Sequence, residues 1–198
     1  MDDFISAEEA LAAFHRVAET IGAGDLHRCT PCPAWDIETL AEHLIDTISR
    51  VAAAAGIPAA AAAAGSIDQR IQQLTQPILN EWSCRGLAGD IFFSGRTLPA
   101  QLALGILSLE LVVHGWDLGV AMHRPIRISD AHAAYVLGLA RRTLTEQSRA
   151  VAGFDPPVPM PASAAALDRL VAFTGRDPQQ QIQERAVPQH SCTTATRD

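Results

Sequence analysis

The clearest repeat of apolar residues in this chain lies between residues 36 and 51. Apolar side chains recur there about every 3.6 residues, which is the period of an α-helix with one buried face. Asp36, directly before the repeat, is typical of an N-terminal helix cap. The pattern therefore predicts an amphipathic helix that begins after Asp36. The apolar members are Ile37, Leu40, Ala41, Leu44, Ile45, Ile48 and Val51.

Capping residues predict helices over most of the remaining chain. Ser6 and Ser66 each have Glu or Gln three residues later, the spacing of a capping box. Ser129 precedes another apolar stripe, and Ser163 precedes a short one near the C-terminus. Only residues 91–93 have strand character, and that stretch is short. The expected fold class is all-α, a mainly antiparallel four-helix bundle with a short additional C-terminal helix.

A long apolar run from Pro99 to Met122 contains three ionisable residues, Glu110, His114 and Asp117. Their spacing of four and then three residues places all three on one face of a helix. A polar group without a partner in apolar surroundings costs on the order of 2 to 7 kcal/mol. A metal ion is one partner that Glu and His can share at this spacing. The alternative is an intrahelical Glu–His hydrogen bond worth only about 0.2 to 0.5 kcal/mol, and the spacing alone leaves both open.

The helix with the clearest apolar repeat offers a third metal ligand in His43. This residue lies beside the apolar stripe, on the side shared with Leu40 and Thr47. A single histidine in such a place is more often a satisfied core or boundary residue than a ligand. If the two helices face each other, however, His43 meets Glu110 and His114. Two imidazoles and one carboxylate leave an open coordination position, which is typical of a catalytic metal site and not of a closed structural one.

Three sequence blocks follow one another along most of the chain. They are TPCPAW at 30–35 with LAEHL at 40–44, then ELVVHGWDL at 110–118, then DRLVAFTGRDP at 168–178. In this order they resemble the metal-binding four-helix bundles of the DinB superfamily, in the branch related to the mycothiol-dependent maleylpyruvate isomerase.

The resemblance implies a ligand set and a co-substrate. His43, Glu110 and His114 are implied to bind a divalent metal ion, most often zinc in such proteins. Asp117 and Trp116 also match family positions. Asp117 is expected beside the ligands, and no chemical role is assigned to Trp116. Mycothiol is the implied thiol.

Length and charge narrow the class of protein. The 198 residues suffice for one compact domain, which we expect over 1–178, followed by a disordered tail at 179–198. The net charge of −7, without any basic run, argues against a nucleic-acid partner. The alanine-rich stretch at 51–65 is interrupted by glycine and proline, which argues against a membrane span. Acidic residues directly after Met1, where a signal peptide needs a basic start, predict a cytoplasmic location.

All fifteen basic residues are arginine, and the chain has no lysine. Schiff-base catalysis, lysine-linked pyridoxal phosphate and a P-loop are therefore excluded. This composition is also associated with GC-rich genomes, which fits an actinobacterial host that makes mycothiol.

The cysteines allow a second reading. Cys29 and Cys32 form a C-x-x-C pair, which could be redox-active or half of a zinc site. No second pair follows, since Cys84 and Cys192 lack a matching spacing, and the βαβ context of a thioredoxin is missing. We expect thiols and a reducing compartment.

Two arginines and the remaining histidines are expected to be solvated. Arg141 and Arg142 could hold an anionic substrate group, but a solvated helix face is the expectation. The five remaining histidines fall on polar faces, in loops or in the tail, and are expected to be solvated. They are His15, His27, His123, His132 and His190.

The leading function is that of a thiol-dependent transferase or isomerase with an electrophilic small-molecule substrate. A divalent ion with an open position can lower the pKa of a bound thiol. The alternatives are a small metal-dependent hydrolase and a non-enzymatic domain that binds a metal or small ligand. The isomerases carry an additional C-terminal domain, whereas only a short helix and a tail follow Pro161 here, which favours the transferase over the isomerase itself. A homodimer is one possible assembly.

Overall fold

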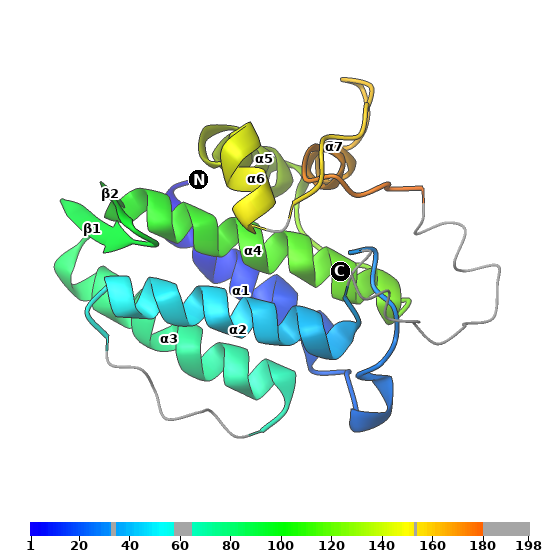
Figure 1. Ribbon diagram of the computed structural model, residues 1–198, viewed down its shortest axis with the longest axis horizontal. Helices are drawn as coiled ribbons and strands as arrows, with labels where there is room; N and C mark the ends of the chain where they lie inside the picture. The colour runs from blue at the N-terminus through cyan, green and yellow to red at the C-terminus, as the bar shows by residue number, and fades with distance from the viewer. Residues whose placement is uncertain (33–34, 58–64, 153, 180–198) are drawn as a thin grey trace.

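The computed structural model describes residues 1–32, 35–57, 65–152 and 154–179. These residues form helices and one short hairpin (Figure 1), so the predicted all-α four-helix bundle is confirmed. The bundle helices are α1 (Asp3–Ala18), α2 (Ile37–Ala54), α3 (Ile67–Arg85) and α4 (Ala100–Ala121).

Helix α4 runs through the middle of the molecule. It contacts α1, α2 and α5 (Asp130–Thr143), and every residue from Leu107 to Ala121 is buried. In Figure 1, α5, α6 (Glu146–Ala152) and the C-terminal α7 (Ala166–Phe173) lie above α4, on the side away from α3. Three ionisable residues of α4 are therefore enclosed by the rest of the fold.

By length and apolarity, α4 is the one helix among the described residues that could cross a membrane. However, 94% of its most apolar window is buried inside the protein. Its apolar surface is therefore used to build the core of the bundle.

Three of the predicted caps are present. The side chains of Asp36, Ser66 and Ser129 each accept a hydrogen bond from the backbone three residues later. The prediction that Ser6 caps the first helix is wrong. Helix α1 already begins after Asp2, whose carboxylate accepts a hydrogen bond from the Ile5 N–H at 2.8 Å. The earlier carboxylate satisfies the free N–H groups of the first turn and leaves Ser6 inside the helix.

Other boundaries also differ from the sequence prediction. The strand-like stretch is β1 (Asp90–Phe93), and its antiparallel partner β2 (Arg96–Pro99) was not predicted. The C-terminal helix begins at Ala166, and Ser163 does not cap it. Of the tail predicted over residues 179–198, all but Gln179 lies outside the described residues.

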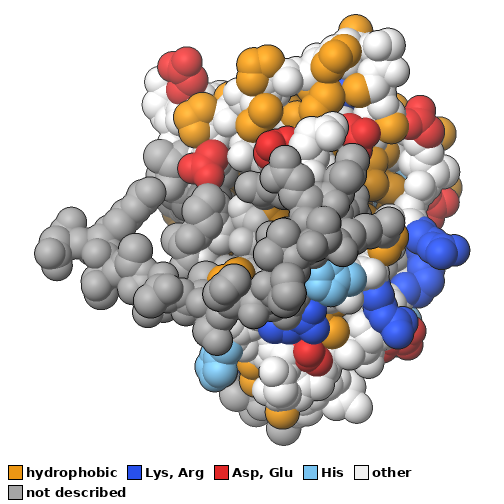
Figure 2. Space-filling model, turned by 90° about the vertical axis from the view of Figure 1, so that its right-hand side faces the viewer, with side chains coloured by type: hydrophobic (Ala, Val, Ile, Leu, Met, Phe, Trp, Pro, Cys, Tyr) orange, Lys and Arg blue, Asp and Glu red, His pale blue; other side chains and the backbone are white. Residues whose placement is uncertain are grey.

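The face drawn in Figure 2 mixes apolar, acidic and basic side chains. Arginine side chains on its described part lie next to carboxylates. This distribution follows from the acidic composition of the chain, and the lack of a nucleic-acid partner stays a prediction.

Candidate metal centre

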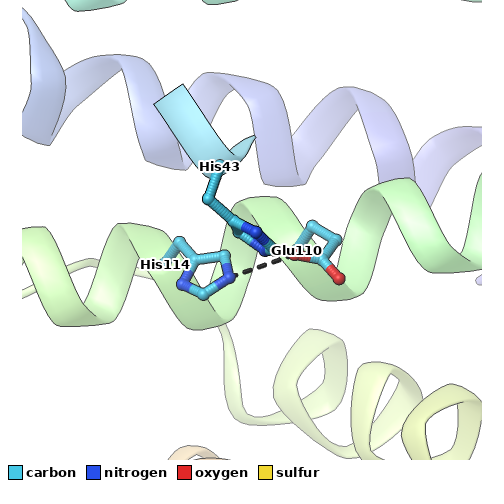
Figure 3. A group of neighbouring side chains, drawn as sticks. All are labelled: His43, Glu110 and His114. Carbon is cyan, nitrogen blue, oxygen red and sulfur yellow. Dashed lines mark ion pairs between the residues drawn. The ribbon is translucent and has the colours of Figure 1, made fainter. Parts of the chain in front are cut away.

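Three side chains from facing helices meet in the bundle. His43 projects from α2, and Glu110 and His114 project from α4 one turn apart (Figure 3). One ligand atom of each lies within 4.8 Å of the other two. The structure thus brings together the three residues that the sequence singled out as ligands.

The atoms that face one another lack hydrogen-bond partners. His114 Nε2 lies 3.0 Å and His43 Nε2 lies 3.6 Å from Glu110 Oε2. These contacts do not have hydrogen-bond geometry, so all three buried atoms are unsatisfied within the described structure. Leaving such an atom without a partner costs about 1 to 3 kcal/mol, and a shared cation would satisfy all three.

The spacing of these atoms fits a small divalent cation. Ligand atoms about 2.0 to 2.2 Å from a tetrahedral zinc ion lie about 3.4 Å from one another. The two contacts of Glu110, at 3.0 and 3.6 Å, bracket this value. The donor set of two imidazoles and one carboxylate is also one that zinc accepts.

Charge at the centre is shifted in the direction that suits a cation. Burial alone would raise the pKa of Glu110, but its contacts with His114 and His43 outweigh burial and hold that pKa far below its usual range. Burial would lower the pKa of His114, but Asp117 and Glu110 raise it. The centre therefore keeps a carboxylate and attracts positive charge.

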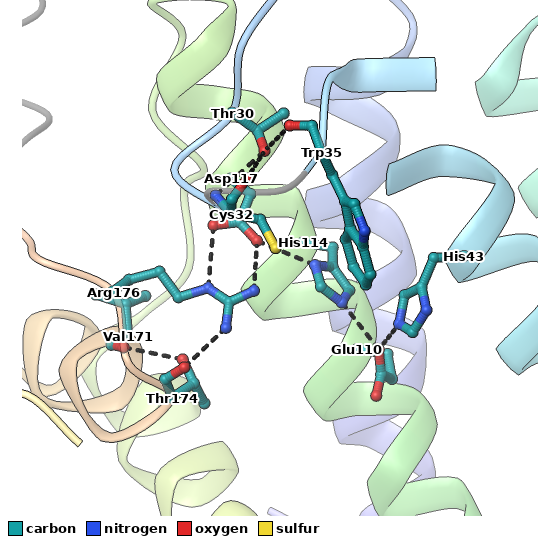
Figure 4. A network of polar contacts seen from close by, with 10 residues as sticks. All are labelled: Thr30, Cys32, Trp35, His43, Glu110, His114, Asp117, Val171, Thr174 and Arg176. Atoms are coloured by element: carbon teal, nitrogen blue, oxygen red, sulfur yellow. Dashed lines mark hydrogen bonds and ion pairs between the residues drawn. The ribbon is translucent and has the colours of Figure 1, made fainter. Parts of the chain in front are cut away.

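A buried ion pair lies behind His114 (Figure 4). Asp117 Oδ2 lies 3.0 Å from His114 Nδ1, and Arg176 donates to both carboxylate oxygens, at 2.9 and 3.2 Å. A carboxylate at Nδ1 favours the tautomer with its proton on that nitrogen, which leaves the lone pair of Nε2 directed at Glu110 and His43. Asp117 thus lies beside the ligand atoms, as expected.

The charge of Arg176 also controls the ionisation of Asp117. Burial would raise the pKa of this carboxyl, but Arg176 and the contact with His114 lower it below its usual value. Arg176 is itself buried, and it donates to the Thr174 carbonyl at 2.7 Å. Both charges of the pair are therefore compensated within the protein.

Gly175 brings Arg176 into this position. Its backbone is left-handed, with φ of 88°, and a Cβ built there would lie 2.5 Å from the Cβ of Asp155. Only glycine adopts this conformation in this space at little cost. Sequence analysis missed Arg176, although it lies in the quoted 168–178 block, because no local pattern shows its distant partner Asp117.

Two aromatic rings flank the imidazoles. The Trp35 ring lies 4.4 Å from that of His43, and the Phe154 ring is stacked 6.0 Å from that of His114. The Arg176 guanidinium lies 5.1 Å from the centre of the Phe154 ring. The loop before α2 and the C-terminal segment thus enclose the centre from two sides.

A pocket of about 330 Å³ leads to His43 and Glu110 from outside. Its walls come from α2, the hairpin, α4, the end of α5 and α6. A substrate can therefore approach the centre beside α2 while the aromatic rings cover other sides.

Other predicted residues have different places. Trp116 is a buried core residue. No disulfide joins Cys29 and Cys32, and the backbone of Cys29 pairs with Asp36 in an isolated bridge. Cys32 is buried and interacts electrostatically with Arg176. The C-x-x-C segment thus supports the loop that leads into α2.

The expected solvation of His132 is wrong. This side chain is buried, with Nε2 3.1 Å from Ser6 Oγ and Nδ1 3.3 Å from a carboxylate oxygen of Glu9. Its partners Ser6 and Glu9 belong to α1, and a contact between two helices far apart in the chain is not visible in the local sequence of α5. His190 lies outside the described residues, and Arg141 and Arg142 are exposed, as expected.

Comparisons with known proteins support the resemblance seen in the sequence. Residues 7–84 match a family model described as the mycothiol maleylpyruvate isomerase N-terminal domain. The matched segment contains His43, whereas Glu110 and His114 follow it. Two uncharacterized proteins, from two strains of Mycobacterium tuberculosis, are each 25% identical to the chain over 179 residues, covering 89% of this chain and 98% of the relative. Comparison with the solved structures found no match.

Proposed function

We propose that this chain, whose residues 7–84 belong to the family of the mycothiol maleylpyruvate isomerase N-terminal domain, binds one divalent metal ion and activates a thiol for transfer to an electrophilic small molecule. His43, Glu110 and His114 would hold the ion, for which zinc is the first candidate. The observation that carries the proposal is the set of three buried, unsatisfied donor atoms of His43, Glu110 and His114, of which His43 and Glu110 line a pocket.

A divalent ion held by these residues would supply Lewis acidity, which would lower the pKa of a thiol so that a thiolate exists near neutral pH. Glu110 contributes the anionic ligand, and each imidazole contributes the lone pair of Nε2. Asp117 keeps the proton of His114 on Nδ1 by accepting it in a hydrogen bond. The protein groups thus fix the ligand geometry before any substrate enters.

Charge balance supports a single anionic ligand from outside. The carboxylates Glu110 and Asp117 carry two negative charges, and Arg176 returns one positive charge. With a divalent ion, the buried groups sum to plus one, which one thiolate neutralises. A buried site favours such neutrality because uncompensated charge is costly in apolar surroundings.

The walls restrict access by water. Trp35 covers His43 and Phe154 covers His114, while the pocket gives entry to the thiol and the electrophile. Mycothiol is the thiol that we propose, on the basis of the family. A cytoplasmic location is part of the same proposal, because mycothiol is an intracellular thiol.

The ligand assignment is tested by competition with a chelator. His43→Ala, Glu110→Gln and His114→Ala should each lose most of their zinc, because the three residues bind as one unit. His15→Ala is the control, since this partly exposed residue of α1 bonds to Asp68 and should retain one equivalent. His132, being buried, does not serve as a control. Retention of zinc by all three ligand variants would refute the assignment.

The thiol step is tested with cobalt-substituted protein. Addition of mycothiol should produce an intense sulfur-to-cobalt charge-transfer band in wild type, and thiol conjugation should be lost in His114→Ala. Ester hydrolysis without a charge-transfer band would replace the transferase with a hydrolase. If the protein binds metal but shows neither a charge-transfer band nor turnover, the non-enzymatic metal-binding domain would replace the transferase and the hydrolase as the proposed function.

A further inference from the structure

Two arginines line the pocket beside the centre, although the chain carries a net charge of −7. Apart from Glu110 and His43 at its inner end, its titratable lining side chains are Arg50 and Arg96. With Glu110 engaged by a cation, no other carboxylate lines the pocket, although Asp46 outside the lining pairs with Arg50. The pocket therefore favours a negatively charged group away from the centre.

Arg50 lies at a fixed distance from the centre. His43, Thr47 and Arg50 follow the helical spacing of four and then three residues, so all three lie along one face of α2. Seven residues of helix place the backbone of Arg50 about 10 Å from that of His43. This length suits a small molecule with its anionic group at one end and its reacting atom at the other.

Arg96 comes to the same pocket from the hairpin. It pairs with Phe93 across a two-residue turn in which Ser94 and Gly95 have φ of 48° and 85°. Two left-handed residues are typical of the tight turn that matches the twist of paired strands. The hairpin therefore presents Arg96 from a defined backbone, opposite α2.

Both guanidinium groups have donors to spare. Arg50 uses Nη2 to bond Asp46 at 2.9 Å and Thr47 at 3.2 Å. The side chain of Arg96 makes no hydrogen bond or ion pair within the part of the chain that the structure describes. A guanidinium offers five N–H donors in a planar fork that matches a carboxylate.

Apart from the arginines and the two residues of the centre, the pocket lining combines apolar side chains with uncharged polar ones, which are Thr47, Ser94, Thr143, Thr145, Gln147 and Ser148. Phe93 of the hairpin, Ile106 and Leu109 of α4, and Leu144 after α5 contribute to it. This part of the lining holds no charge that could compensate a second charge on the ligand, so the ligand portion that lies against it should be uncharged. The arrangement separates an anion-binding end from a reactive end.

We propose that Arg50 and Arg96 form a carboxylate-binding subsite, so that the electrophilic substrate is an organic acid with a short uncharged portion between its carboxylate and its reacting carbon. The subsite rests on the proposed function for its role in transfer, but the binding itself does not need the metal. All four arginines are exposed, but Arg141 and Arg142, which the sequence offered for this purpose, do not line this pocket, whereas Arg50 and Arg96 do.

The test compares two ligands of nearly equal shape, 4-methylbenzoate and 4-methylbenzamide, by titration calorimetry or ligand-detected NMR. The wild-type protein should bind the carboxylate at least about fivefold more tightly than the amide, both with zinc and after removal of metal by a chelator. Arg50→Gln/Arg96→Gln should bind the two equally in the metal-free form. Arg85→Gln/Arg141→Gln removes the same charge from exposed positions outside this pocket and should keep the preference.

The outcomes separate the subsite from the metal centre. Equal binding of the two ligands by metal-free wild type would overturn the proposal, and so would an unchanged preference in Arg50→Gln/Arg96→Gln. A preference seen only with zinc would assign the carboxylate to the ion and overturn the arginine subsite. The subsite is supported if Arg50→Gln/Arg96→Gln loses the preference for the carboxylate and Arg85→Gln/Arg141→Gln keeps it. This result would support the subsite even if the tests of metal binding and thiol transfer fail. Each single variant should lose part of the preference, which keeps the test valid if the double variant does not fold.

Discussion

Replacement of Arg176 by glutamine should weaken both the fold and the metal centre. Arg176 and Asp117 are 3% and 0% exposed, and the guanidinium donates to both carboxylate oxygens. Arg176→Gln leaves a buried carboxylate whose remaining contact is with His114, and removal of one partner of such a pair costs about 3 to 5 kcal/mol. For a chain of this length, about 2 to 4 °C in Tm per kcal/mol gives a fall of about 6 to 20 °C.

The assay is thermal unfolding followed by circular dichroism, on metal-free and zinc-loaded protein. Asp117→Asn should destabilise the protein by a similar amount, because it leaves the guanidinium buried without its anion. Arg176→Gln/Asp117→Asn should be less destabilised than the sum of the two changes, since neither charge remains. Arg169→Gln is the control on α7, because this arginine makes no ion pair within the described residues.

The same variants should bind zinc about 10- to 100-fold more weakly, because Asp117 is either replaced or no longer held against His114 Nδ1 by Arg176. If Tm falls by less than about 2 °C in Arg176→Gln, or if the effects of the two changes add up in the double variant, the argument that the pair compensates two buried charges is refuted. Unchanged zinc affinity in Asp117→Asn would show that Asp117 does not orient His114.

Three further changes test other parts of the structure. Burial lowers the pKa of His132 in spite of Glu9, so the neutral side chain stabilises the fold fully above the unfolded value of 6.5. Tm should therefore fall as pH falls below 6.5, and it should fall less in His132→Gln. Gly175→Ala should lower Tm and zinc affinity together, because a Cβ there meets Asp155 and displaces Arg176, and a change in Tm alone would contradict this. Cys29→Ser should leave zinc content and Tm nearly unchanged, and a large loss of either would restore the cysteine pair as a site.

The sequence predicted the parts of the site that depend on helical periodicity. Glu110 and His114 share a face of α4 because they are one turn apart, and their burial follows from the apolar residues around them. His43 required the further step that α2 faces α4, which the apolar stripe of α2 and the bundle topology supplied.

The residues that were missed depend on contacts between distant segments. Arg176 meets Asp117 across 59 positions, and no local pattern records that pairing. Arg96 reaches the pocket only because β2 pairs with β1. The sequence of β2 lacks the alternation of apolar and polar residues that would predict a strand. His132 was misjudged because its partners Ser6 and Glu9 lie on α1, far from it in the sequence.

The most direct test of the central claim is zinc-edge X-ray absorption on protein loaded with one equivalent of zinc and no added thiol. Coordination by His43, His114 and Glu110 predicts nitrogen and oxygen scatterers at about 2.0 to 2.2 Å, with the multiple scattering of two imidazoles and no sulfur. A sulfur shell at about 2.3 Å in that sample would place the ion on cysteine and contradict the account.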